Sequence, residues 1–104
     1  MSSSKALTIP DLVEFARQGT VSKTLLDVPH VKVTLFCMSA GQELTEHTAG
    51  HPVTIHFLEG EGEFVLGRES HAIVPGAWFY LEARAPHALK IRANTVFVLT
   101  LLRS

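Results

Sequence analysis

The sequence predicts an all-β fold, namely a small antiparallel sandwich or barrel with one short N-terminal helix. Three observations support this prediction. Short apolar runs that suit strands recur roughly every 8 to 12 residues. Glycine, proline and asparagine separate these runs at expected turns. Only one short stretch has the apolar spacing of a helix. The chain has 104 residues, which suits a single domain with one core.

The N-terminal part of the chain divides into a tail and the expected helix. Residues 1–8 are serine-rich and polar, and they predict a flexible tail ahead of a single domain over residues 9–104. The helix is expected over residues 9–16, where apolar side chains recur at three-to-four spacing and Pro10 lies close to the first turn. Gly19 is expected to end it.

Short strands and tight turns are expected along the rest of the chain. Turns are predicted at residues 59–62 and 93–94. Alternation along residues 31–38 places Cys37 in the core, which is where free cysteines usually lie. The last run is apolar on both faces and indicates a strand covered on both sides, in a sandwich or at a subunit interface. The expected strands are residues 21–26, 31–38, 43–47, 53–58, 63–66, 71–74, 77–81, 87–91 and 96–102.

Composition limits the classes of partner and compartment. The formal net charge is -1 and no run of lysine or arginine occurs, so neither nucleic acid nor a membrane is expected as a partner. Hydrophobic residues make up 46% of the chain and charged residues 18%, which indicates apolar surface that a homodimer would cover. The single Cys37 suits a reducing cytoplasm. No stretch has the length of a signal-peptide core or a membrane helix, so a cytoplasmic protein is expected.

Residues 41–67 carry three of the six histidines, His47, His51 and His56, between glycine-marked turns. Imidazole is the commonest protein metal ligand, and its charge changes near neutral pH, so this clustering indicates a site. Alternation places His56 on the opposite strand face from its immediate neighbours. If those neighbours line a barrel, His56 points outward, and it is therefore the weakest of the histidine candidates.

Five features of the sequence form one pattern: Gly41, His47, residues 58–61, Pro75 with Gly76, and residues 85–87. This pattern resembles the cupin superfamily, specifically its small single-domain RmlC-like members of the cupin 2 type. The resemblance covers residues 21–102 and implies a small antiparallel jelly-roll barrel. It also implies one divalent metal inside the barrel, held in the family by an HxH pair and a glutamate of the first motif and by a histidine of the second.

The family's metal motif is degenerate in this chain. His47 falls on the first histidine of the pattern and His87 on the histidine of the second motif. Ala49 occupies the second histidine position, and Val53 falls on the glutamate position. His51 is the natural substitute ligand, because a shortened loop would swing it toward the missing position. The expected site is therefore His47, His51 and His87, binding zinc, nickel, iron, copper or manganese, with a metal-free barrel as the open alternative.

The resemblance leaves the specific function open. The metal site would suit a metal-dependent enzyme acting on a small organic substrate. A metal-free module that binds or senses a small molecule is the second possibility, and a non-catalytic interaction protein is the third. In the first two cases a small-molecule ligand occupies the barrel, whose expected lining is Ala49, Val53, Ile55, Phe57, Trp78 and Tyr80.

Overall fold

The computed structural model describes residues 4–103 and confirms the all-β prediction. Within these residues the chain forms one antiparallel sheet of 7 strands, preceded by a short 3-10 helix. The elements are η1 (Ile9–Leu12), β1 (Thr20–Val28), β2 (Val31–Met38), β3 (Glu43–His47), β4 (Val53–Leu66), β5 (Glu69–Ile73), β6 (Trp78–Leu81) and β7 (His87–Leu102).

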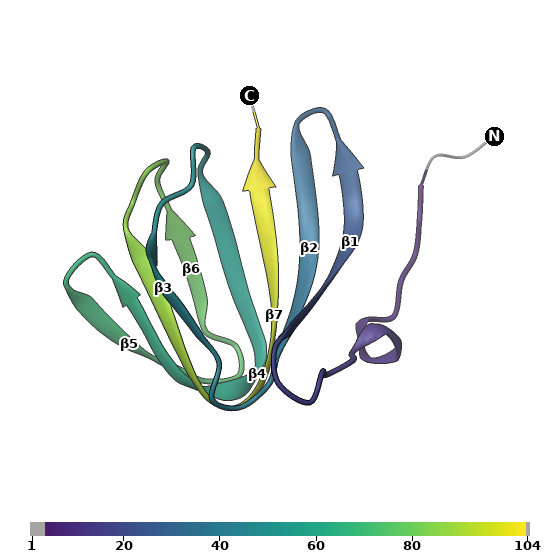
Figure 1. Cartoon of the computed structure of the whole chain (residues 1–104). Coiled ribbons are helices and arrows are strands. Elements are labelled where there is room, and N and C mark those ends of the chain that lie inside the picture. The colour runs from purple at the N-terminus through teal and green to yellow at the C-terminus, as the bar shows by residue number, and fades with distance from the viewer. Residues whose placement is uncertain (1–3, 104) are drawn as a thin grey trace.

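Two long strands organise the sheet. β4 and β7 pair antiparallel along most of their length, and both bend near the middle. The bend divides the sheet into two arms; Figure 1 shows β1 and β2 on one side of the molecule and β3 and β5 on the other. In the first arm, β1 pairs with β2, β2 pairs with residues 95–102 of β7, and β6 pairs with residues 53–56 of β4. In the second arm, β3 and β5 pair with the start of β7 and the end of β4. The fold is of the jelly-roll type, with a sheet that stays open among the described residues.

The two turns predicted at residues 59–62 and 93–94 are wrong. Both segments lie inside continuous strands, at the bends of β4 and β7. The pairing register shifts at three successive points between Phe57 and Gly62, so β-bulges bend the strand without ending it. The glycines at this point allow close approach of the two strands, and they do not form a hairpin.

The predicted N-terminal helix is shorter than expected. Only Ile9–Leu12 is helical, as a 3-10 turn without a side-chain cap, and Val13 has already returned to extended backbone. The apolar residues of this segment pack on the outside of the first arm, against a cluster formed by Leu25, Leu35, Cys37 and Val96. Cys37 is buried there, as predicted.

The main core lies between the two arms. Its centre is a group of phenylalanine rings in contact, with centroid separations of 4.5 Å for Phe64 and Phe79 and 5.2 Å for Phe57 and Phe97. The remaining buried members are Met38, Val53, Ile55, Ile73, Leu81, Leu89 and Ile91. Because both arms contribute rings, burial of this core holds the arms together.

Both ends of the described chain are fastened to the β1–β2 hairpin. Lys5 of the predicted tail donates from Nζ to the Leu25 carbonyl at 2.9 Å, while residues 1–3 of that tail lie outside the described residues. At the other end, Arg103 pairs with Asp27 at 2.6 Å, and this hydrogen bond lowers the pKa of the Asp27 carboxyl. No helix in the described part of the chain has the length and apolarity needed to cross a membrane.

Candidate functional site

His47 and His87 lie side by side, although they are far apart in the sequence. β3 pairs with the start of β7, and the register sets the two residues directly opposite each other. Their ring centroids are 4.1 Å apart, and the ring planes are inclined by 58°. The structure therefore brings together the two histidines that fall on the family's ligand positions.

Both rings are oriented by backbone carbonyls. His47 Nδ1 lies 2.8 Å from the Thr45 carbonyl oxygen, and His87 Nδ1 lies 2.9 Å from that of Ala85. A carbonyl oxygen can only accept, so Nδ1 carries the proton in each ring. In the neutral imidazole, Nε2 then keeps its lone pair. The pair thus offers two nitrogen acceptors, in the orientation that metal-ligating histidines also have.

The two histidines differ in burial. His87 is only 5% exposed, whereas His47 is exposed at the mouth of the site. Burial lowers the pKa of His87; the Ala85 carbonyl opposes this effect by raising it, and the neighbouring His47 lowers it further. His87 is therefore neutral at pH 7, which keeps its Nε2 lone pair available.

A cavity of about 240 Å³ lies between the arms next to this pair. The second arm contributes both histidines to its wall, and the first arm contributes apolar side chains. Phe36 and Phe97 of the first arm are stacked, with centroids 5.0 Å apart and planes inclined by 14°. The remaining wall is aliphatic, so the histidine nitrogens are the polar groups of an otherwise apolar cavity. The lining residues are Phe36, Leu44, His47, Ile55, His87, Leu89, Phe97 and Leu99.

Ile55 is the one residue of the predicted lining that lines this cavity. Val53 and Phe57 point to the same interior but are buried in the main core, and Ala49 packs against that core. Trp78 and Tyr80 lie on the outer face, with 59% and 49% of their surface exposed. The reason is alternation along β6, which turns Phe79 inward and its two aromatic neighbours outward.

The other two candidate histidines lie away from the pair. His51 is exposed in the loop between β3 and β4. His56 is exposed on the outer face, opposite Trp78 on β6. Within residues 4–103, no group of three or more histidine, cysteine, aspartate or glutamate side chains is placed to hold a metal ion. The pair thus supplies two of the three histidines that the sequence suggested.

The loop that carries His51 is nevertheless tied to the loop before His87. The Arg84 amide donates to the Ala49 carbonyl at 2.7 Å. Arg84 itself adopts a left-handed backbone with φ of 68°, a conformation unusual for a residue other than glycine. This hydrogen bond holds the two loops together.

Sequence reasoning missed most of the cavity wall. Leu89 shares a strand face with His87, and alternation alone indicates that it points the same way. Phe97 and Leu99 could be found only by treating β7 as one strand, because the predicted turn at residues 93–94 separated them from His87. Phe36 and Leu44 reach the wall through the pairing of β2 and β3 with β7.

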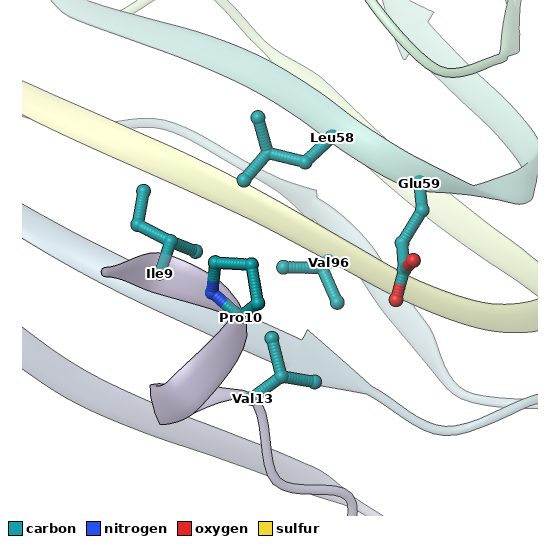
Figure 2. A pocket seen from close by; sticks show the side chains of 6 residues that line it. All are labelled: Ile9, Pro10, Val13, Leu58, Glu59 and Val96. Atoms are coloured by element: carbon teal, nitrogen blue, oxygen red, sulfur yellow. The ribbon is translucent and has the colours of Figure 1, made fainter.

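A second cavity, of about 300 Å³, lies on the opposite face of the sheet. Figure 2 shows Ile9, Pro10 and Val13 of the N-terminal segment facing Leu58 and Val96 of the long strands, with the Glu59 carboxylate beside them. This cavity is separate from the histidine pair. It marks where the N-terminal segment covers the sheet without filling all of the space beneath it.

The buried neutral His87 makes folding stability depend on pH. Its pKa in the folded protein lies below the ordinary value of 6.5, so the unfolded chain binds a proton that the folded chain does not. We expect stability to fall as the pH drops below about 6.5, toward the lowered pKa. Urea unfolding at a series of pH values, with EDTA present, measures this slope. His87→Phe should flatten the slope; an unchanged slope in this variant would contradict the assignment.

Comparisons with solved structures identify cupin proteins that share this fold. No protein-family profile matches the sequence, and no curated protein is found as a relative. Among solved structures, a cupin superfamily protein from Desulfitobacterium hafniense has a TM-score of 0.84 at 20% identity, over 100% of this chain and 95% of that one. An RmlC-like cupin from Desulfovibrio desulfuricans has a TM-score of 0.77 at 28% identity, over 98% and 96%.

A larger enzyme contains the same fold. Salicylate 1,2-dioxygenase from Pseudoaminobacter salicylatoxidans matches 80% of this chain with 26% of its own length, at a TM-score of 0.74 and 16% identity. At this identity the match shows a shared fold and carries no further argument about the site.

Proposed function

Because the chain folds as a small cupin domain, we propose that it binds a small, largely apolar organic molecule with one hydroxyl group in the cavity between the arms. One observation carries this proposal. The Nδ1 atoms of His47 and His87 are both occupied by backbone carbonyls, so their Nε2 lone pairs are the acceptors at an apolar cavity. A ligand that presents a hydrogen-bond donor matches this arrangement.

The size and walls of the cavity narrow the ligand class. A cavity of about 240 Å³ is smaller than sites for drug-sized ligands, which start at about 300 Å³, so the ligand is a compact molecule. The stacked rings of Phe36 and Phe97 offer a flat apolar wall, which suits an aromatic ring. Phenol, a single aromatic ring with one hydroxyl group, is therefore a suitable probe.

Phenol should bind more tightly than toluene, which has a similar shape but lacks the hydroxyl. We expect a difference of about tenfold, because toluene leaves the buried His87 acceptor without a partner at a cost of about 1 to 3 kcal/mol. Titration of ¹⁵N-labelled protein with each probe, followed by NMR with EDTA present, measures both dissociation constants. The expected shifts centre on the amides of Leu89 and Leu99.

Variants separate this site from non-specific binding. His87→Phe fills the same space without an acceptor, so it should remove the preference for phenol over toluene. His71→Phe makes the same change outside the cavity and should keep that preference. Equal affinities of the unmodified protein for both probes, or shifts confined to residues outside the cavity, would contradict the proposed site.

A divalent metal is the second candidate ligand. Metal-ligating histidines commonly donate Nδ1 to a carbonyl, and both members of the pair have this contact. The donor set fits part of a metal site, since His47 and His87 offer two imidazole nitrogens where three protein ligands are usual. The third position would fall to His51 or to the organic ligand, and a bound metal would polarise an oxygen of that ligand.

Cobalt(II) titration tests the metal candidate independently of phenol. A visible absorption band that saturates at one equivalent, and is lost in His47→Ala and in His87→Ala, supports it. A band that persists in His51→Ala assigns the third position to solvent or to the organic ligand. Absence of saturable binding to the unmodified protein removes the metal candidate and leaves the phenol measurement unaffected.

A further inference from the structure

The cavity beneath the N-terminal segment has aliphatic walls on both sides. Ile9, Pro10 and Val13 of the segment form one side, and Leu58 and Val96 of the long strands form the other (Figure 2). Its volume of about 300 Å³ lies at the lower end of the range for small-molecule sites, about 300 to 1,000 Å³. Because these five walls are branched or cyclic aliphatic groups, the cavity suits an alkyl chain and offers no flat ring for stacking.

The sixth lining residue, Glu59, reaches this cavity because of the bend in β4. Glu59 directly follows Leu58, and consecutive residues of a regular strand point to opposite faces. The pairing register shifts on both sides of Glu59, first after Phe57 and again before Glu61. Such bulges re-aim a side chain. The bend thus brings a carboxylate to the same cavity as the Leu58 side chain (Figure 2).

The Glu59 carboxylate has no cationic partner within residues 4–103. None of the ion pairs in this part of the chain includes it, whereas the nearby Glu61 pairs with Arg92 at 3.8 Å. A negative charge beside aliphatic walls is complementary to a ligand with a positive charge at one end of an alkyl chain. A primary amine has this form, because it is protonated at pH 7.

We propose that this cavity is a second small-molecule site, which binds an aliphatic ammonium ion. The alkyl chain lies between the N-terminal segment and the sheet, and the ammonium group pairs with Glu59. Burial of the alkyl chain supplies most of the affinity. Because Glu59 is exposed, its ion pair adds a modest preference for the cation. The site is on the opposite face of the sheet from the histidine pair, so the two ligands bind independently.

Three probes of the same chain length separate the contributions of charge and alkyl chain. We expect hexylammonium to bind about threefold more tightly than 1-hexanol, as for an exposed ion pair, and hexanoate to bind most weakly because Glu59 repels it. NMR titration of ¹³C-methyl-labelled protein measures the three dissociation constants. The expected shifts are those of the Ile9, Val13 and Val96 methyl groups, which line this cavity.

A matched pair of variants assigns the charge preference to one carboxylate. Glu59→Gln keeps the shape of the side chain without its charge, so hexylammonium and hexanol should then bind equally. Glu43→Gln removes the same charge from an exposed position on β3 in the second arm and should keep the preference. Equal loss of the preference in both variants would make it an effect of net charge and overturn the proposal.

Cys37 provides an independent measurement of the same site. Its thiol is fully buried in the cluster against which Ile9 and Val13 pack, so it reacts with Ellman's reagent only when this cover opens. Hexylammonium at ten times its dissociation constant lowers the unliganded fraction about tenfold by mass action. We therefore expect the reaction to slow about tenfold in the unmodified protein, and less in Glu59→Gln at the same amine concentration.

Three results would overturn the proposal. The first is equal affinity of the unmodified protein for all three probes. The second is a set of methyl shifts confined to Leu44 and Leu89, which line the histidine cavity. The third is a set of shifts at Ile9 and Val13 that follows the protein concentration instead of the amine concentration, since a second copy of the chain would then cover the cavity.

Discussion

Replacing Gly60 with alanine is expected to lower the free energy of unfolding by about 3 to 5 kcal/mol. Gly60 lies at the bend of β4 with φ of 132°, a backbone conformation that side chains rarely adopt. An added Cβ would lie 2.2 Å from Oγ1 and 2.6 Å from Cβ of Thr95. Thr95 is buried in β7 and cannot move away, because its hydroxyl donates to the Ala93 carbonyl and accepts from the Glu61 amide.

The size of this effect follows from the place of Gly60 in the fold. The bends of β4 and β7 lie against each other, and together they place the two arms on either side of the core. A Cβ at Gly60 adds both backbone strain and overpacking at this point. Since a domain of this size is stable by only about 5 to 15 kcal/mol, the variant should lose a large share of its stability, measured as a shift of the urea midpoint.

Two other glycines serve as controls for the same substitution. Gly67 has φ of 63° but open space around it, so Gly67→Ala should cost only the backbone strain of about 1 to 2 kcal/mol. Gly50 lies in open space without a positive φ, and Gly50→Ala should change stability by less than about 1 kcal/mol. If Gly60→Ala and Gly67→Ala lower the free energy of unfolding by the same amount, the contact with Thr95 adds nothing to the cost of the backbone strain.

These bends also explain which parts of the fold the sequence could predict. Alternation and turn residues are local signals, and they predicted the observed bounds of β2 and β3. The run from Glu59 to Gly62 has the same residue types as a hairpin turn. Only the pairing of β4 with β7 across the bend decides that the strand continues, and that pairing involves residues far apart in the sequence. Local sequence signals therefore could not distinguish a turn from a bulge.

The candidate site likewise contains residues that the sequence could identify and residues that it could not. The resemblance to a known motif singled out His47 and His87, and the pairing of β3 with β7 brings them together. The cavity wall depends on Phe97 and Leu99, which face His87 only because β7 bends back over the core. For Trp78 and Tyr80, alternation predicts that they share a face but not which face is inside. That choice is made by Phe79, which packs against the core rings.

Phe57 was expected to line the cavity, but the ring is buried in the main core. A different prediction follows from this position. The ring is fully buried and contacts Phe64 of the second arm at 6.1 Å and Phe79 and Phe97 of the first arm at 6.0 Å and 5.2 Å, measured between centroids. It therefore connects the two arms. Phe57→Ala should lower the free energy of unfolding by about 3 to 5 kcal/mol, because it removes a large buried side chain and leaves a cavity.

Benzene provides a second measurement on this variant. The space left by Phe57 is enclosed by aromatic and aliphatic side chains, and such a cavity stays dry and accepts benzene. Ligand binding to the folded state raises stability by mass action, so saturating benzene should raise the melting temperature of Phe57→Ala more than that of the unmodified protein. Phe15→Ala removes a partly buried ring outside the core and should cost less, without a benzene response. A loss of unfolding free energy below about 1.5 kcal/mol in Phe57→Ala would mean that this ring does not hold the two arms together. Replacing a core phenylalanine with alanine normally costs more than this.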